Sequence, residues 1–208
     1  GNVLYEISKD IIQQAKPVAA HLLQADESAV EFLEGKFRIA ATGQEIDIIA
    51  VAAVFSEFHG SAEPLTAEYF QDGRIKSYPY GASAAEIEID PDTGDMTICK
   101  YSIVDDCGQA VNPMIVHGQT HGGIVMGAGQ AMGECAFFDM NSGQLLTGSF
   151  MDYMVPRADQ FPMFDIGTME VPSDTNPLRI KAGGEAGTVP ALAVIGNAVR
   201  DALAPYGM

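Results

Sequence analysis

One carboxylate in this sequence lies in a loop of almost bare backbone. Glu185 occurs in RIKAGGEAGTVPALAVIGNAV, residues 179–199, with only alanine and glycine at positions 182–184 and 186–187. Small neighbours let a ligand approach within contact distance of the acid. A ligand covering the loop would take the carboxylate out of water and make it a stronger base, whereas the N-terminus of the following apolar helix opposes this. Glu185 is therefore a candidate general base, and a solvated loop acid is the alternative.

Three other groups of residues suggest chemistry less convincingly. His117 and His121 have the i, i+4 spacing of helical metal ligands, but position 118 is Gly where zinc proteases need Glu, and no third ligand is near. The glycines of GAGQAMG, residues 127–133, lack the dinucleotide-loop spacing and fall inside an expected helix. Cys107 precedes His117 by ten residues, but nothing positions a base against its thiol. We therefore predict no metal ligand from the protein itself.

The composition excludes several classes of partner. The 208 residues carry a net charge of -17, which argues against nucleic acid, because neutralising phosphates requires a basic face. The three cysteines form no CxxC, so neither a disulfide framework nor a zinc site is expected. No apolar run reaches the roughly 18 to 20 residues of a membrane helix, and the start lacks a signal segment. These features predict a soluble, cytoplasmic protein without nucleic-acid or membrane partners.

The elements that position these residues begin with a helix and a hairpin. Apolar spacing predicts a helix over 7–24, capped by Ser8 and kinked or divided at Pro17. Two short strands are expected within 29–40 around Glu34-Gly35, then a helical segment near 47–55 and a loop over 59–64.

A second hairpin is predicted over 82–106. Apolar and polar residues alternate on both sides of the turn at 91–94, and the acids of DPDTGD lack the EF-hand spacing, so a turn is expected rather than a calcium site. A strand pair is expected around 141–143 and a strand near 163–171. A final helix over 190–204 should have Pro190 in its first turn and a buried stripe of Leu192, Ile195, Val199 and Leu203.

The predicted helix 113–134 contains six glycines. Each costs about 1 kcal/mol relative to alanine in a helix interior. Their intervals place several on one face, which a close helix–sheet or helix–cofactor approach would explain. Long helices interspersed with hairpins favour an α+β fold with mixed sheets and packed helices in two layers.

Taken together, the motifs of the chain resemble one family. YGASAAEIEIDPDTG, VDDCGQAVNPMIVHGQTHGGIVMGAGQAMGE, GQLLTGSFMDYMVPRAD and NPLRIKAGGEAGT are similar to the C-terminal part of the molybdopterin-binding large subunit of the xanthine dehydrogenase, aldehyde oxidoreductase and aerobic carbon monoxide dehydrogenase family. Residues 1–60 match more weakly. The resemblance divides the chain into 1–70, part of a preceding cofactor subdomain, and 71–208, the C-terminal molybdopterin-binding subdomain carrying the GEAG loop.

The resemblance implies a cofactor, a reaction and roles for named residues. Family members bind molybdenum through a molybdopterin, often as the cytosine dinucleotide, and hydroxylate an aldehyde, purine or N-heterocycle or oxidise carbon monoxide. Glu185 matches the glutamate that acts as base, and Gln119 the glutamine that hydrogen-bonds near the metal and pterin. The other residues that the resemblance places against the cofactor are Gly118, Gly183, Gly184, Ala186 and Gly187.

The sequence departs from the family at three places and in length. Family members often have KGVGE where this chain has KAGGE, a second glutamine where it has Met126, and glycine where it has Arg179. Family subunits are several times longer, so the chain resembles one piece of a subunit that needs the remainder, 2Fe–2S and FAD partners and a small-molecule substrate, and that forms oligomers in the full enzyme. Alone, it is expected to hold no cofactor and turn over no substrate. A non-catalytic assembly or binding module that retained the fold is the alternative.

Overall fold

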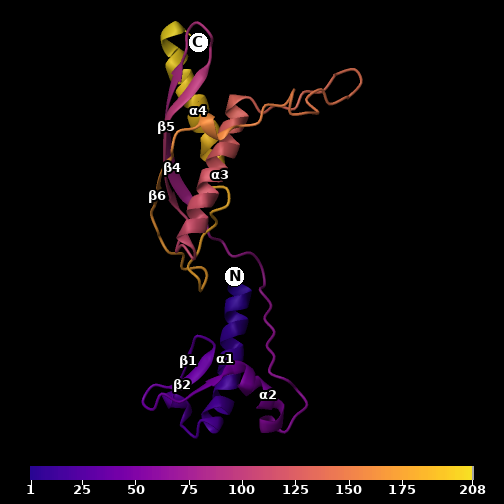
Figure 1. Cartoon of the computed structure of the whole chain (residues 1–208), viewed down its shortest axis with the longest axis vertical. Helices are drawn as coiled ribbons and strands as arrows, with labels where there is room; N and C mark the ends of the chain where they lie inside the picture. Colours follow the sequence, from indigo (N-terminus) through magenta and orange to yellow (C-terminus); the bar gives the residue numbers. More distant parts are fainter. Residues whose placement is uncertain (208) are drawn as a thin grey trace. The chain divides into compact units, whose positions relative to one another are not determined.

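The computed structural model describes residues 1–207, which divide into two compact units. The first unit runs from Gly1 to Arg74 and the second from Ile75 onward. Figure 1 shows the helices and strands of both units. No helix among the described residues combines the length and apolar character needed to cross a membrane.

The first unit packs two helices with a small antiparallel sheet. Its elements are α1 (Asn2–Leu22), η1 (Glu27–Ala29), β1 (Val30–Leu33), β2 (Lys36–Ile39), β3 (Glu45–Asp47) and α2 (Ile48–His59). The sheet order is β1-β2-β3, and the hairpin predicted around Glu34-Gly35 is confirmed. Both turn residues have positive φ, which suits a tight turn between strands. The core gathers fully buried side chains from all these layers, namely Val18, Val30, Phe37 and Val51.

The structure corrects the predicted cap of the first helix and excludes its division at Pro17. Helix α1 begins at Asn2, so Ser8 lies inside it and its hydroxyl donates to the Leu4 carbonyl instead of capping the start. Pro17 does not divide the helix in two. Asp47 is the residue that caps α2, by accepting a hydrogen bond from the Ile49 amide at 2.7 Å.

The second unit places two helices on one face of a mixed sheet. Its elements are β4 (Tyr80–Ile89), β5 (Met96–Asp106), α3 (Pro113–Met132), η2 (Ala158–Gln160), β6 (Asp165–Thr168), α4 (Thr188–Leu203) and η3 (Ala204–Tyr206). β4 and β5 are antiparallel, whereas β5 and β6 are parallel. The core between sheet and helices contains Tyr101, Ile103, Ile124 and Ile195. This two-layer α+β arrangement with a mixed sheet confirms the predicted fold class.

The turn of the long hairpin has the predicted chemistry. Asp90 accepts hydrogen bonds from the amides of Asp92 and Thr93, at 2.8 and 3.2 Å, and Gly94 adopts a φ of 78°. The acids of this segment therefore form a turn, as expected, and the hairpin holds β5 in register for the site at its end.

The glycines of α3 bring two helices together. A Cβ on Gly127 would lie 2.5 Å from the Thr188 carbonyl oxygen of α4, and one on Gly123 would lie 3.0 Å from the Thr188 amide. The glycines predicted a close approach of this helix to a neighbour, and at Gly123 and Gly127 that neighbour is helix α4. Leu192 was predicted to be buried on α4 but is 46% exposed, because Ala191 occupies the buried position beside α3.

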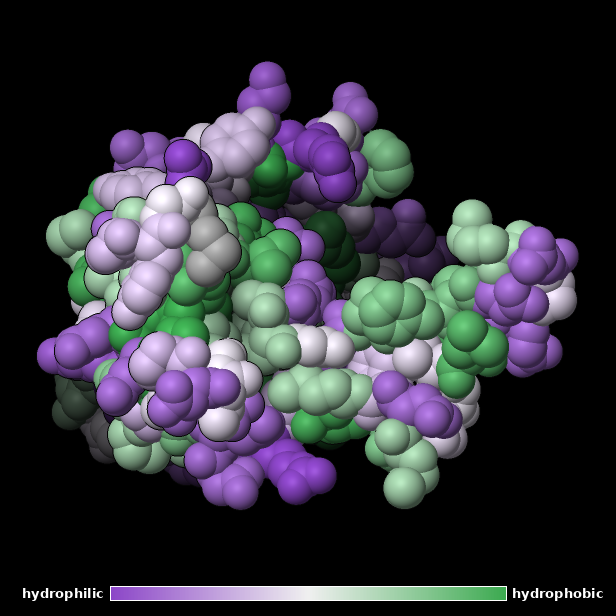
Figure 2. All heavy atoms as spheres, turned by 90° about the horizontal axis from the view of Figure 1, so that it is seen from above, coloured by the Kyte–Doolittle hydropathy of each residue, from purple (hydrophilic) through white to green (hydrophobic). Residues whose placement is uncertain are grey.

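Residues 135–156 leave the C-terminal end of α3 as a projecting segment, which we call the arm (Figure 1). The strand pair predicted around 141–143 is reduced to a single bridge between Phe138 and Leu145. The space-filling view shows hydrophobic atoms lying open on the projecting part at the right (Figure 2). The arm thus leaves large apolar side chains in contact with water.

Candidate functional site

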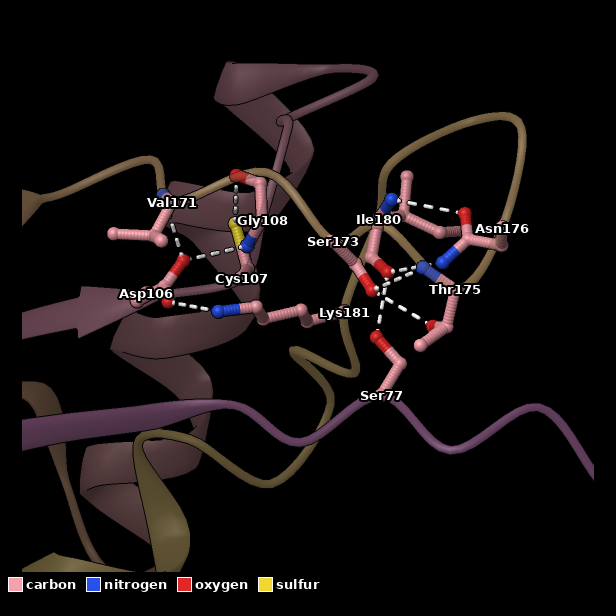
Figure 3. A network of polar contacts seen from close by, with 10 residues as sticks. All are labelled: Ser77, Asp106, Cys107, Gly108, Val171, Ser173, Thr175, Asn176, Ile180 and Lys181. Atoms are coloured by element: carbon pink, nitrogen blue, oxygen red, sulfur yellow. Dashed lines mark hydrogen bonds and ion pairs between the residues drawn. The ribbon is translucent and has the colours of Figure 1, made fainter.

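A buried ion pair anchors the segment that leads to Glu185. Asp106 ends β5 with its side chain only 1% exposed, and its Oδ2 pairs with Lys181 Nζ (Figure 3). Its Oδ1 accepts hydrogen bonds from the amides of Gly108, at 2.8 Å, and Val171, at 3.0 Å. Burial raises the pKa of Asp106, but the hydrogen bond from Lys181 and those from the two amides outweigh it, so the pKa lies below its usual value. Asp106 is therefore held as a carboxylate.

The loop before Lys181 is tied to the same strand end by backbone hydrogen bonds. The Lys181 amide donates to the Cys107 carbonyl at 2.8 Å, and the Gln109 amide donates to the Arg179 carbonyl at 3.0 Å. Asn176 brackets Ile180, accepting from its amide and donating to its carbonyl (Figure 3). Together these bonds fix where the glycine loop begins.

The glycine loop itself is held by α3. Gln119 Nε2 donates to the Gly184 carbonyl oxygen at 2.8 Å. Gly187 is buried against α3, where a Cβ would clash with the Thr120 carbonyl oxygen and lie 2.9 Å from the Ile124 amide. The Glu185 carbonyl accepts from the amides that open α4, those of Thr188 and Val189. The backbone on both sides of the Glu185 side chain is therefore fixed.

The amides of this loop have no partner in the described part of the protein, and those of Gly184 and Glu185 belong to residues that line a cleft. Within residues 1–207, the amide groups of 184–187 have no hydrogen-bond acceptor. They lie at the N-terminus of α4, where successive unpaired N–H groups and the helix dipole favour a negatively charged or hydrogen-bond-accepting ligand.

A cleft of about 300 Å³ opens beside the loop, which we call the Glu185 cleft. The exposed Glu185 side chain lines it together with residues of α3 and the start of α4. The remaining lining residues are Gln119, Gly122, Gly123, Met126, Gly184, Thr188 and Val189. The cleft thus combines one carboxylate, one amide side chain and glycines that leave the backbone accessible.

The structure brings together some of the predicted site residues but not all. Gln119, Gly184 and Glu185 share the Glu185 cleft. Gly118 is exposed one residue away, with nothing within 4 Å of where a Cβ would lie. Gly183 instead faces Cys107: a Cβ added to Gly183 would lie 3.5 Å from the Cys107 Cβ. Ala186 is half-buried and Gly187 is buried, and neither lines the cleft.

The anchoring pair was missed by reasoning from the sequence. Asp106 and Lys181 are 75 residues apart, and no local pattern of charges relates them. The only signal was that each belongs to a segment already singled out, DDCGQA for the aspartate and KAGGEAG for the lysine. Thr188, which lines the cleft and meets Gly123, was also missed.

Two weaker candidates gain nothing from the geometry. His121 Nδ1 is hydrogen-bonded to the His117 carbonyl oxygen at 2.9 Å. The part of the chain that the structure describes contains no cluster of three potential metal ligands. Cys107 is buried, and burial raises the pKa of its thiol, which disfavours the reactive thiolate.

Comparison with known proteins gives a consistent result. Residues 1–162 match the family model described as molybdopterin cofactor-binding domain. In Paenarthrobacter nicotinovorans, the nicotine 6-hydroxylase large subunit is 37% identical over 203 residues, which are 95% of this chain and 25% of that protein. The 6-hydroxypseudooxynicotine dehydrogenase complex subunit gamma of the same organism is 36% identical over 199 residues, 93% of this chain and 25% of that protein.

A solved structure supports the same relationship. Carbon monoxide dehydrogenase from Oligotropha carboxidovorans is similar with a TM-score of 0.78 and 31% identity, covering 95% of this chain and 25% of that one. The chain therefore spans about a quarter of the length of the relatives that it matches. These matches agree with the resemblance drawn from the motifs.

Proposed function

Because this chain belongs to the molybdopterin cofactor-binding domain family, we propose that it is the C-terminal, base-bearing part of the catalytic subunit of a molybdenum hydroxylase. The proposed reaction is oxidative hydroxylation of an aldehyde, purine or N-heterocycle, or oxidation of carbon monoxide. The observation that carries this proposal is the Glu185 cleft, which is lined by Glu185, Gln119 and Gly184 and includes two residues with unpaired backbone amides, Gly184 and Glu185.

The residues of the loop fit a molybdopterin. Unpaired amides over 184–187 suit the hydrogen-bond acceptors of a pterin and its phosphate, and the glycines let these groups reach the backbone. We propose that Gln119, Gly118, Gly183, Gly184, Ala186 and Gly187 hold the cofactor. The cytosine dinucleotide form is proposed from the family resemblance. When bound, the molybdenum cofactor supplies the two-electron redox chemistry, and the protein supplies orientation and a base.

Glu185 is proposed as the general base. Its backbone is fixed by the start of α4 while its side chain remains exposed in the cleft, so a carboxylate oxygen can accept a proton without movement of the loop. Gln119 holds the loop through the Gly184 carbonyl. The geometry therefore supports a positioned base beside a backbone cradle.

The remaining three quarters of the subunit, absent from this chain, is its first proposed partner. It would complete the cofactor and substrate sites, and 2Fe–2S and FAD subunits would take up the electrons in a larger oligomer. The isolated chain is proposed to retain no cofactor and no activity. Cys99, Cys107 and Cys135 are free thiols, which supports the cytoplasm as the proposed location.

Purification of the native complex tests this proposal. Metal analysis should find molybdenum in the complex, and acid hydrolysis should release cytidine monophosphate. The isolated 208-residue chain, purified in parallel, should contain neither. A native complex without molybdenum would overturn the assignment and favour the non-catalytic assembly module.

A further inference from the structure

The arm carries more exposed apolar surface than a free segment of this size needs. Eight of its 22 residues are large hydrophobic side chains that remain exposed. The most open are Met140 at 94%, Met151 at 93% and Phe150 at 88%. Single exposed hydrophobic residues are ordinary, but eight of them gathered on one segment of 22 residues are typical of a binding surface.

The tip of the arm is an ordered structure. The Leu146 amide donates to the Phe137 carbonyl at 2.8 Å, and the Phe137 amide donates to Thr147 Oγ1 at 3.0 Å. At the turn, the Gly143 amide donates to the Asp139 carbonyl at 2.8 Å. The apolar side chains are therefore presented on a folded backbone, which lowers the entropy cost of binding.

The base of the arm is fixed to α3. Glu134, which precedes the arm, and Pro156, its last residue, both lie against Gly129, where a Cβ would be 2.5 Å from Pro156 Cγ. Tyr153 donates from its hydroxyl to Glu134 Oε1 at 3.1 Å. The two ends meet on one glycine of the helix, so the arm projects as a closed loop from a fixed root (Figure 1).

The length of the relatives points to an occupant for the arm. They match 93 to 95% of this chain, yet the chain spans only 25% of their length. The arm includes two acids, Asp139 and Asp152, and no lysine or arginine. A partner surface that complements the arm is therefore apolar with a basic rim. The three quarters of the relatives' length that this chain does not span can provide such a surface.

We propose that the arm docks the remainder of the molybdenum subunit onto this chain. Phe138, Phe150 and Met151 are the proposed anchoring side chains, because all three are exposed and aromatic and methionine side chains are enriched at interfaces. A hollow of about 690 Å³ lined by residues 150–155, Arg157 and Gln160 would receive side chains of that partner. This inference rests on the proposed function, which supplies the partner.

The test measures binding between two separately produced polypeptides without cofactor. One is this chain, and the other is the remainder of the subunit encoded in its genome of origin. The triple variant Phe138→Ser, Phe150→Ser, Met151→Ser should bind at least about 30-fold more weakly than the unmodified chain. Met163→Ser is the matched control, because Met163 is 88% exposed outside the arm, and its affinity should be unchanged.

Thermal unfolding of the variants serves as the folding control, since all substituted side chains are exposed. Equal binding by the unmodified chain and the triple variant would overturn the docking role but leave the proposed function standing. No binding by the unmodified chain would overturn the proposed function and this inference with it. If light scattering shows that the chain alone dimerises through the arm, a second copy is the occupant and the proposal is wrong.

Discussion

Gln119 on α3 donates a hydrogen bond from Nε2 to the Gly184 carbonyl oxygen, at 2.8 Å, across 65 residues of sequence. This bond joins the helix that contains the glycines to the loop that presents Glu185. Gln119 was expected only as a cofactor contact. The structure shows that it also holds the loop, which leaves its Oε1 as the atom free to face a ligand.

Removing this bond should loosen the glycine loop. In Gln119→Met, amide hydrogen exchange at Thr188 and Val189, which donate to the Glu185 carbonyl of the loop, should accelerate. The free energy of unfolding should fall by about 1 kcal/mol, because one exposed hydrogen bond is lost. Gln130→Met is the matched control, since Gln130 is an exposed glutamine on the same helix. Unchanged exchange in Gln119→Met would contradict a positioning role.

Two glycines of α3 should respond to alanine with opposite signs. Gly127→Ala places a Cβ 2.5 Å from the Thr188 carbonyl and should cost about 1 to 3 kcal/mol through overpacking. In Gly122→Ala the added Cβ has no neighbour within 4 Å, so the higher helix propensity of alanine should stabilise the protein by up to about 1 kcal/mol.

Urea unfolding of the two isolated variants measures both effects under the same conditions. Stabilisation of both variants would show that the approach of α4 does not exclude a side chain at position 127. Because Gly122 lines the Glu185 cleft, its alanine variant should nevertheless lower the molybdenum content of the assembled complex.

Much of the fold follows from local patterns. Turn residues and alternation predicted both hairpins, and the length and apolar content of 113–134 predicted α3. These features depend on neighbouring residues, which a single sequence displays directly. Predictions failed where distant packing decides: Ala191, not Leu192, is buried on α4 because the glycines of α3 leave room only for a small side chain.

The site was predictable only in part for the same reason. A carboxylate among glycines could be identified locally, and the family resemblance added Gln119. The pairing of Asp106 with Lys181 depends on the fold bringing two distant segments together, which no spacing rule predicts. Likewise, nothing in the sequence distinguishes Gly187, buried against α3, from the exposed Gly184.

Breaking the buried ion pair should be costly. Lys181→Met leaves the Asp106 carboxylate buried and unpaired and should lower the free energy of unfolding by about 3 to 5 kcal/mol. Lys100→Met, at an exposed position on β5, should change it little.

The double variant Lys181→Met, Asp106→Asn should recover part of the loss, because Asn has no charge and its Oδ1 can still accept from the two amides. Urea unfolding of the two single variants and the double variant measures this. If the losses in unfolding free energy of the two single variants simply add in the double variant, the two side chains do not stabilise each other.

The same carboxylate should make stability depend on acid pH. The pKa of Asp106 is lower in the folded chain than in the unfolded chain, where it is near 3.9, so its contribution is complete above that value. That contribution is lost as the pH falls through the folded-state pKa.

The difference in unfolding free energy between the unmodified chain and Asp106→Asn should therefore shrink as the pH is lowered from about 6 towards 2. Asp165→Asn, at an exposed position of β6, controls for general acid effects. A difference that stays constant over this range would show that Asp106 is not a carboxylate whose pKa is lowered by folding.

Glu185 is proposed as the base of a molybdenum hydroxylase, and one variant tests this role most directly. Glu185→Gln preserves the size of the side chain and the backbone cradle but cannot accept the proton. In the assembled native complex, it should retain molybdenum at the unmodified level and lose hydroxylation by at least about 100-fold. Full molybdenum content with substantial remaining hydroxylation would contradict the assignment of Glu185 as the base.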